Sequence, residues 1–566
     1  MKKIIYSMAI MLAILVSSCK KDYLDINDNP NTPTTSTGQL VLTNALNVTA
    51  GRIGHNQIGS FWGGYWSPPT TVSGFAPERT YNAQASFGTA VGLWQSCYDN
   101  LNDYDFVEKY GQENKIPILT GMAQVMKVFN FQLLVDAYGD VPYKQALKGL
   151  DNFTPAYDSA PAIYADLIPK LDVAISNLRQ AVNPDFLITT QDIYFGGNTV
   201  SWVRFANTLK LRILLRQSKI AGKDQYIKDE IAKIFSTTDV INGTTLSVFL
   251  SGQFFLAKNE NVASNPGYLR TTGRQNPFFE FYFVNAANAS SPSRQFYVPS
   301  LYFTDKIYEN SPDDLRDVRT IGGNANVAGG FTGTTLAITR PVVLAWSGVP
   351  FGETNNPLGG SFGYSDVANF GPGVFRSFNQ NAVVMTASEA LMLQAEAKEL
   401  GFMPAAFAPT ALALFQDAVR SSFVILYTTG ASAIPAANAE AAANAYMALP
   451  GNTNALNGFI GNYATSPDKL RTIMEQKFIC LFGFSGFETW CDVRKYQNVD
   501  GTPSTILDIP RSVNTGVIGS PSSRPLRLPY PVIEQQVNNT NLKAAIAAQQ
   551  FGATIVSGKG IFWDVK

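Results

Sequence analysis

Apolar residues recur at every third or fourth position in several stretches near both ends of the chain. This spacing places them on one face of an α-helix, so each stretch predicts an amphipathic helix packed on a core. The stretches are 91–101, 122–133, 164–178, 202–213, 388–402, 412–423 and 470–481. We expect a further helix from about Gln39, ending near the stretch FWGGYWSPP at 61–69.

Two segments lack this periodicity. Residues 225–382 are rich in Gly, Asn, Ser, Thr and aromatics, which predicts loops, short strands and a few short helices. Residues 429–465 are rich in Ala and Asn and predict marginal helix and loop. The stretch LMLQAEAKELGF (391–402) resembles half of a tetratricopeptide repeat, in which alanine lets paired helices approach closely. We therefore predict a mainly α fold, an α-solenoid of tetratricopeptide-like helix pairs that supports an irregular, loop-rich insert.

The N-terminus predicts export and lipidation. A basic MKK start precedes an apolar run over 4–16, too short for a stable membrane span. Val16-Ser17-Ser18-Cys19 then resembles a bacterial lipobox, in which the Cys19 thiol receives the lipid. We expect a signal peptide at 1–18 and a polar tether at 19–39. No second apolar run is judged long enough to span a bilayer.

Composition narrows the function further. Charged residues make up 15% of the chain, against about 25% in ordinary soluble proteins, and 43 basic residues balance 43 acidic ones. No basic patch stands out, so nucleic acid is not an expected partner. Besides Cys19 the chain has three cysteines, Cys97, Cys480 and Cys491. This odd number favours free buried thiols, although Cys480 and Cys491 could pair across a turn.

Six motifs, in this order along the chain, resemble those of the SusD/RagB outer-membrane lipoproteins of Bacteroidetes, in particular the SusD-like nutrient-binding branch. They are CKKDYLDINDNPNTPT after the lipobox, FQLLVDAYGDVPYKQAL (131–147), WVRFANTLKLRILLRQS (202–218), LMLQAEAKELGF, KFICLFGFSGFETWCDVRKY (477–496), and RLPYPVIEQQVNNTN (527–541) with the ending Phe562-Trp563-Asp564. The resemblance covers nearly the whole chain.

The resemblance implies a single domain over 40–566. Its helical scaffold would occupy about 40–222 and 383–498, its substrate-facing insert about 225–382, and a C-terminal segment 499–566. It also implies a lipid-anchored protein on the outer membrane, exposed at the cell surface, and a SusC-like TonB-dependent transporter as partner. The protein would sit over the transporter as a lid and deliver nutrient to it.

The polar motifs favour structural roles. In YGDVPY, Gly139 permits a positive φ and Pro142 blocks further helix, so turn chemistry accounts for the motif around Asp140. Glu488 and Asp492 are four residues apart and share a helix face, where we expect a helix-packing ion network. Arg204, Arg212 and Arg216 are the expected partners of such acidic groups.

Little in the sequence indicates catalysis. His55 is the only histidine, and no nucleophile elbow, phosphate loop, HExxH or paired CxxC motif occurs. We expect a protein that is not an enzyme and needs no cofactor or metal, while calcium binding stays open. A surface hydrolase that uses a carboxylate pair is retained as an alternative.

Aromatic residues supply the candidate ligand site. Carbohydrate rings stack their C–H faces on aromatic side chains while amides bind their hydroxyls. Two aromatic regions qualify, 61–81 and 274–302, and Trp62 is predicted to belong to the core. The predicted ligand-binding residues are Tyr65, Trp66, Tyr81, Arg274, Asn276, Phe281 and Tyr282. Oligosaccharide is the expected cargo, peptide cargo is the alternative within the same class, and a purely structural lipoprotein is a third hypothesis.

Overall fold

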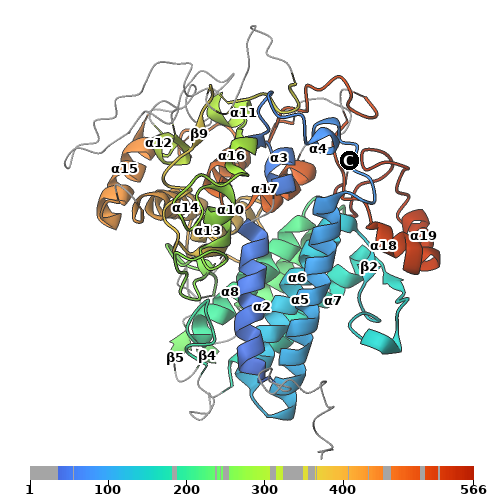
Figure 1. The fold of residues 1–566 in the computed structure, drawn as a ribbon. Helices are drawn as coiled ribbons and strands as arrows, with labels where there is room; N and C mark the ends of the chain where they lie inside the picture. The colour runs from blue at the N-terminus through green and yellow to red at the C-terminus, as the bar shows by residue number, and fades with distance from the viewer. Residues whose placement is uncertain are drawn as a thin grey trace, which may run out of the picture.

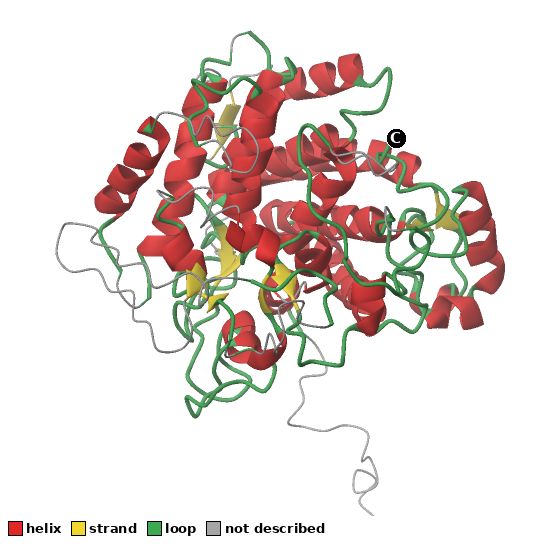
Figure 2. Ribbon diagram, turned by 90° about the horizontal axis from the view of Figure 1, so that it is seen from above, coloured by secondary structure: helices red, strands yellow, loops and turns green. Residues whose placement is uncertain are grey.

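A computed structural model gives the fold of the protein. It describes residues 36–54, 57–180, 188–235, 239–241, 244–246, 254–305, 314–322, 348–354, 364, 366–405, 407–430, 433–449, 461–496, 504–520 and 523–565. Helices dominate the regular structure, and the strands are few and short (Figure 2). The mainly α prediction is therefore confirmed. Cys19 and His55 lie outside the described residues.

Long helices from the first part of the chain form one half of the scaffold, in which α2, α5 and α6 lie side by side (Figure 1). α6 packs between α5 and α7, and α7 packs in turn on α8. The helices are α2 (Gly38–Gly54), α3 (Gln57–Trp62), α4 (Ala76–Thr80), α5 (Gly88–Glu113), α6 (Pro117–Tyr138), α7 (Ala160–Leu178), α8 (Thr199–Arg216) and α9 (Asp224–Ile234).

α6 is the most apolar of these long helices. By length and composition α6 could cross a membrane. The prediction that no second apolar run is long enough to span a bilayer is therefore wrong for this helix. Nearly all of its side chains are buried because neighbouring helices cover it on several sides. It therefore serves as the central helix of this half of the scaffold.

The second half of the scaffold comes from later in the chain. α13 pairs with α14 and also packs on α16, and α15 covers α14. Thr386, rather than a residue inside the helix, caps α13, because its hydroxyl accepts the N–H of Glu389 at 3.0 Å. The helices of this half are α13 (Ala387–Glu399), α14 (Ala411–Tyr427), α15 (Ala436–Ala448), α16 (Lys469–Leu481) and α17 (Gly486–Tyr496). The C-terminal segment adds α18 (Val532–Val537) and α19 (Asn539–Ala548), and α19 lies against the strand Tyr157–Asp158.

Short elements fill the predicted insert, as its composition indicates. Its helices are the short α10 (Pro277–Tyr282), α11 (Leu301–Thr304) and α12 (Asp317–Thr320), with a 3₁₀ turn at Arg294–Phe296 and another at Gly149–Asp151 outside the insert. The 11-residue α9 also falls at the start of the predicted insert, so regular helix extends further than the composition predicts. Antiparallel pairs join β1 (Trp66–Ser67) to β7 (Val298–Pro299), β2 (Val141–Pro142) to β3 (Tyr157–Asp158), β4 (Asp239–Ile241) to β5 (Thr244–Leu246), β6 (Val262–Ser264) to β10 (Ala382–Met385) and β8 (Ile321–Gly322) to β9 (Asn369–Phe370).

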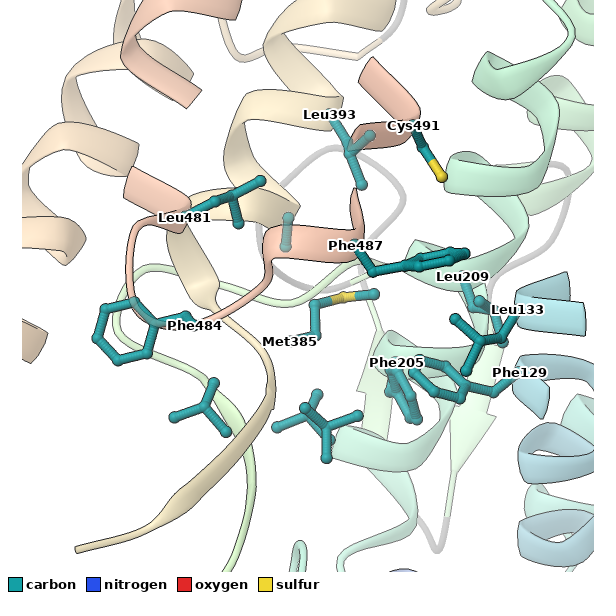
Figure 3. Packing of buried hydrophobic residues seen from close by; sticks show 14 of the residues in the cluster. Phe129, Leu133, Phe205, Leu209, Met385, Leu393, Leu481, Phe484, Phe487 and Cys491 are labelled. Carbon is teal, nitrogen blue, oxygen red and sulfur yellow. The ribbon is translucent and has the colours of Figure 1, made fainter. Parts of the chain in front are cut away.

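A continuous apolar core joins the two halves. Figure 3 shows Phe129 of α6 and Phe205 of α8 facing the same interior as Leu393 of α13 and Phe487 of α17, and all four are buried. The cysteines at 97, 480 and 491 are free and buried, which confirms the favoured interpretation. Burial of this surface from both halves makes the scaffold one packed unit.

Glycine allows the closest helix contact. A Cβ built on Gly59 of α3 would lie 2.5 Å from the backbone nitrogen of Phe487 and 2.6 Å from the backbone carbon of Gly486, at the start of α17. α3 ends at Trp62, within the aromatic stretch at 61–66, so this contact fixes the position of that stretch on the scaffold.

We predict that Gly59→Ala destabilises the protein by about 1–3 kcal/mol, because α3 and α17 must separate. Gly92→Ala is the matched control, since nothing lies within 4 Å of its added Cβ in the interior of α5. That control should be neutral or up to about 1 kcal/mol more stable. Urea unfolding of both variants measures the difference, and equal midpoints would contradict the close approach.

Candidate functional site

Charged residues of α8 and α17, the helices that carry the motifs at 202–218 and 477–496, form a buried ion network between the two halves. Arg212 of α8 pairs with Glu389 of α13 at 2.6 Å and with Glu488 of α17 at 3.4 Å. Arg216 also pairs with Glu488, and its guanidinium lies 3.5 Å from Asp492. Burial opposes ionisation of Glu488, but Arg212 and Arg216 outweigh it and leave the pKa of Glu488 below its ordinary value.

The network continues to the C-terminal segment. Asp136 of α6 lies 3.5 Å from Arg216 and accepts a hydrogen bond from the indole N–H of Trp563 at 2.8 Å. On the other side, Lys477 of α16 pairs with Asp492 at 2.9 Å. Glu488 and Asp492 are thus matched with buried cations, as expected of a packing network, and they do not flank an open cleft. Of the three predicted arginines, Arg204 departs from this pattern and pairs with Glu260 at 3.3 Å.

We predict that Glu488→Gln lowers the stability by about 3–5 kcal/mol, because it leaves two buried guanidiniums with less compensating charge. Glu440→Gln is the control, since its pair with Lys258 at 2.8 Å lies on the surface and should be worth less than about 1 kcal/mol. Urea unfolding measures both changes. A loss as small as that of the control would show that the network does not hold the halves together.

The YGDVPY motif ends α6 and starts the next helix. Gly139 has φ 88°, which stops α6, and the Asp140 carboxylate accepts the N–H of Ala160 at 2.7 Å at the start of α7. The Tyr530 hydroxyl donates to the Asp140 carbonyl at 2.8 Å, which attaches the C-terminal segment to this turn. Burial, reinforced by Asp158 and opposed by the Ala160 N–H, raises the pKa of Asp140 to about 6. The motif is structural, as the sequence predicts.

This raised pKa gives a pH dependence with a definite sign. The folded protein binds a proton at Asp140 more tightly than the unfolded chain does, so this group's contribution to stability falls as pH rises from about 4 to about 6. We predict that, as pH rises over that interval, the free energy of unfolding of Asp140→Asn increases by about 1–2 kcal/mol relative to that of wild type. Urea midpoints measured from pH 4 to pH 8 test this, and parallel curves for the two proteins would contradict it.

The two predicted aromatic regions meet in space. β1 pairs with β7, which places Trp66 opposite Pro299. The Trp66 ring lies 5.1 Å from Tyr282, 5.6 Å from Tyr297 and 5.3 Å from Phe370, measured between ring centroids. Trp66 belongs to a strand after the helix has ended at Trp62, so its helical spacing from Trp62 is coincidental. The two regions therefore form one aromatic cluster.

This cluster is mostly interior, which corrects the expected surface position of five predicted residues. Tyr65, Trp66, Tyr81, Asn276 and Tyr282 are all buried. Large aromatic rings from different segments stabilise one another by excluding water, so a stretch rich in them packs inward when a second such stretch is available. Trp62 is buried against Trp490, as predicted for a core residue.

Several polar groups in this interior are engaged by the protein, whereas the buried indole N–H of Trp66 has no hydrogen-bond partner among the described residues. The Tyr65 hydroxyl is 2.7 Å from that of Thr489 and donates to the Phe478 carbonyl. The Tyr81 hydroxyl accepts the N–H of Ser512 at 2.8 Å. Asn276 caps α10 by accepting the N–H of Phe279 at 3.0 Å. These contacts fix the loops of the insert on the scaffold.

Arg274 and Phe281 remain on the surface. Phe281 is 39% exposed at the end of α10, and Leu269 is 53% exposed on the preceding loop. The loop closes on itself through Leu269 N–H to Arg274 carbonyl (2.8 Å), and on α10 through Gly273 N–H to the Glu280 carboxylate (3.0 Å). We call Leu269, Arg270, Arg274 and Phe281 the insert face.

Sequence reasoning missed two members of this face. The Arg270 guanidinium lies 5.0 Å from the centre of the Phe378 ring and donates to Asn288 at 3.2 Å, so it is held over the surface. Leu269 precedes it. The available signal was the turn sequence that ends at Gly273, whose φ of 73° closes the loop. The face combines an exposed aromatic ring with two guanidiniums, which suits a ligand with apolar faces and hydroxyl groups.

No group of three or more His, Cys, Asp or Glu side chains that could hold a metal ion occurs within the described part of the chain. Glu389, Glu488 and Asp492 of the buried ion network are instead paired with arginine and lysine. The insert face itself offers a ring for stacking and guanidinium N–H groups for hydrogen bonds.

Comparison with known proteins identifies relatives of the fold. The family model SusD-like_2, described as "Starch-binding associating with outer membrane", matches residues 30–505. A SusD homologue from Bacteroides uniformis has a similar structure, with a TM-score of 0.68 and 19% identity over 93% of this chain and 99% of its own. A chitin-binding SusD homologue from Flavobacterium johnsoniae is similar with a TM-score of 0.67 and 19% identity, over 94% of this chain and 98% of its own. No curated protein sequence matches the chain.

Proposed function

Because the chain belongs to the SusD-like family of starch-binding proteins that associate with the outer membrane, we propose that it captures oligosaccharide at the cell surface. It then delivers the cargo, as a lid, to a SusC-like TonB-dependent transporter. The observation that carries the proposal is the insert face, where Phe281 is exposed while Trp66, Tyr282 and Tyr297 of the cluster are buried. The chitin-binding relative supports a saccharide cargo.

Recognition by this face needs no chemical step. The Phe281 ring offers an apolar surface for the C–H face of a sugar, and the guanidiniums of Arg270 and Arg274 offer donors for its hydroxyls. Neutral oligosaccharide fits a face with only two cations. The buried cluster beneath α10 stabilises this arrangement, because Tyr282 lies next to Phe281 in the helix and packs on Trp66.

A hydrolase is the less supported alternative. Glu488 and Asp492, the acidic pair that the sequence offers, are buried and paired with Arg216. A glycosidase needs two carboxylates on opposite sides of an accessible glycosidic bond, which this pair does not supply. We therefore propose a protein that binds and releases its cargo unchanged.

The remaining parts of the proposal rest on the sequence and the family. Lipidation at Cys19 would anchor the protein to the outer membrane, with residues 19–39 as the tether to the scaffold. Outer-membrane association agrees with the family description. Peptide is the second candidate cargo, favoured by the arginines of the insert face.

We predict that Phe281→Ala and Arg274→Ala each weaken binding to a chitin- or starch-derived oligosaccharide about tenfold, because each removes about 1–2 kcal/mol of stacking or hydrogen bonding. Calorimetric titration of the purified protein measures the affinities. Phe106→Ala is the matched control, since Phe106 is exposed to a similar degree (43%) on α5 and lies outside the insert face.

The same titrations distinguish the alternatives. Equal losses in the Phe106 and Phe281 variants would contradict a site on the insert face. Binding of peptides but of no oligosaccharide would assign the face to peptide cargo. Release of shorter sugars by the isolated protein would contradict the binding-only proposal.

A further inference from the structure

A second concave site lies on the scaffold, apart from the insert face. A groove of about 550 Å³ opens between α5, α6 and α7 and the segment 143–148 that follows β2. Figure 1 shows these three helices side by side, with β2 at their edge. The volume is in the range of sites that bind small molecules or peptide side chains. Neither the insert face nor the buried ion network contributes to its lining.

The floor of the groove is apolar. Val128 and Phe131 of α6 and Leu167 of α7 form its base and are themselves buried, and Val173 of α7 stands at its edge with 53% of its surface exposed, so Val173 supplies most of the open apolar contact. A valine so exposed, beside a concave apolar surface, loses water-exposed area when a ligand side chain packs on it. The floor thus favours a ligand with bulky apolar groups.

Lysines outnumber carboxylates around the floor of the groove. Its carboxylates are matched, since Lys127 lies 2.6 Å from Asp105 and 2.8 Å from Glu108. Lys109 pairs with Asp105 at 2.7 Å and Lys170 with Asp166 at 3.6 Å, so the three carboxylates of the lining are matched by three lysines. Two rim lysines, at 144 and 148, are exposed and form no ion pair among the described residues, and the Asp158 carboxylate accepts the backbone N–H of Lys144 at 2.8 Å. The uncompensated charge of the groove is therefore positive.

The lining does not suit a sugar. Tyr143 is the only tyrosine in it, and its ring is buried, packs edge to face on Phe131 with centroids 4.6 Å apart, and lies 6.0 Å from the Lys170 ammonium. Its hydroxyl is already committed to Asp166. A carbohydrate would find no open aromatic face for stacking here.

We propose that this groove binds an acidic peptide segment whose apolar side chains enter the floor while its carboxylates pair with Lys144 and Lys148. Such a segment complements both the positive charge of the rim and the apolar floor. Two uncompensated lysines over such a floor match a short segment that alternates acidic and apolar residues. They do not match a polyanion, which needs many cations and little apolar surface.

Binding of fluorescein-labelled peptides to the full chain from residue 19 onward, with Cys19→Ser to keep it free of lipid, tests the proposal. The panel consists of acidic–apolar peptides, among them DYLDIND, the sequence of residues 22–28, and the same peptides with Asp replaced by Asn. Fluorescence anisotropy should show micromolar binding of acidic members. Binding should weaken at least about tenfold on Asn replacement and between 50 and 500 mM salt.

Variants locate the site. Lys144→Glu with Lys148→Glu should weaken binding about tenfold or more, and Val173→Asp should do so through the floor. Lys228→Glu with Lys543→Glu is the matched control, because these exposed lysines lie on α9 and α19 outside the groove. Thermal midpoints establish that all variants are folded.

Each outcome decides the proposal. Binding that follows peptide acidity, salt and the groove variants supports it. Absence of binding by every acidic peptide, equal effects of the groove and control lysines, or displacement of bound peptide by oligosaccharide would overturn it. Oligosaccharide affinity at the insert face is measured separately, so failure here leaves the proposed cargo function standing.

Discussion

The buried pairing of Arg212 and Arg216 with Glu488 is the interaction on which the rest of the structure depends. These residues come from α8 and α17, in opposite halves of the scaffold, and Glu389, Asp136 and Lys477 extend the pairing to three further helices. Each charge is removed from water, so each is tolerated only while its partners stay in place. The network therefore fixes how the halves dock, and α3 follows because it packs on α17.

The position of the insert is a consequence of that docking. α3 leads directly into Trp66, which pairs with β7 and packs on Tyr282 of α10. The loop carrying Arg270 and Arg274 closes on α10, so the insert face is held by a chain of contacts that begins at the network. Most of the aromatic residues serve this rigidity, and few are left for a ligand. A preformed face of this kind loses little conformational entropy on binding.

The sequence predicts the scaffold well because helices carry a local signal. Apolar spacing and turn chemistry locate α5 to α8 and the end of α6 at Gly139, and charge spacing identifies Glu488 and Asp492 as network members. The candidate site is harder to predict, because a tryptophan buried in the core and one exposed for ligand stacking can have the same local sequence. Trp66 and Tyr282 are buried only because β1 meets β7, a long-range pairing that leaves no periodic pattern. Arg274 and Phe281 could be identified, whereas Leu269 and Arg270 depend on loop closure.

The central claim is that cargo is held at the insert face while the aromatic cluster beneath it stays interior. Hydrogen–deuterium exchange with and without saturating oligosaccharide tests this claim most directly. The account predicts that bound oligosaccharide slows exchange over residues 269–282 and leaves residues 57–67 unchanged. Slowed exchange over 57–67 without any change over 269–282 would contradict it.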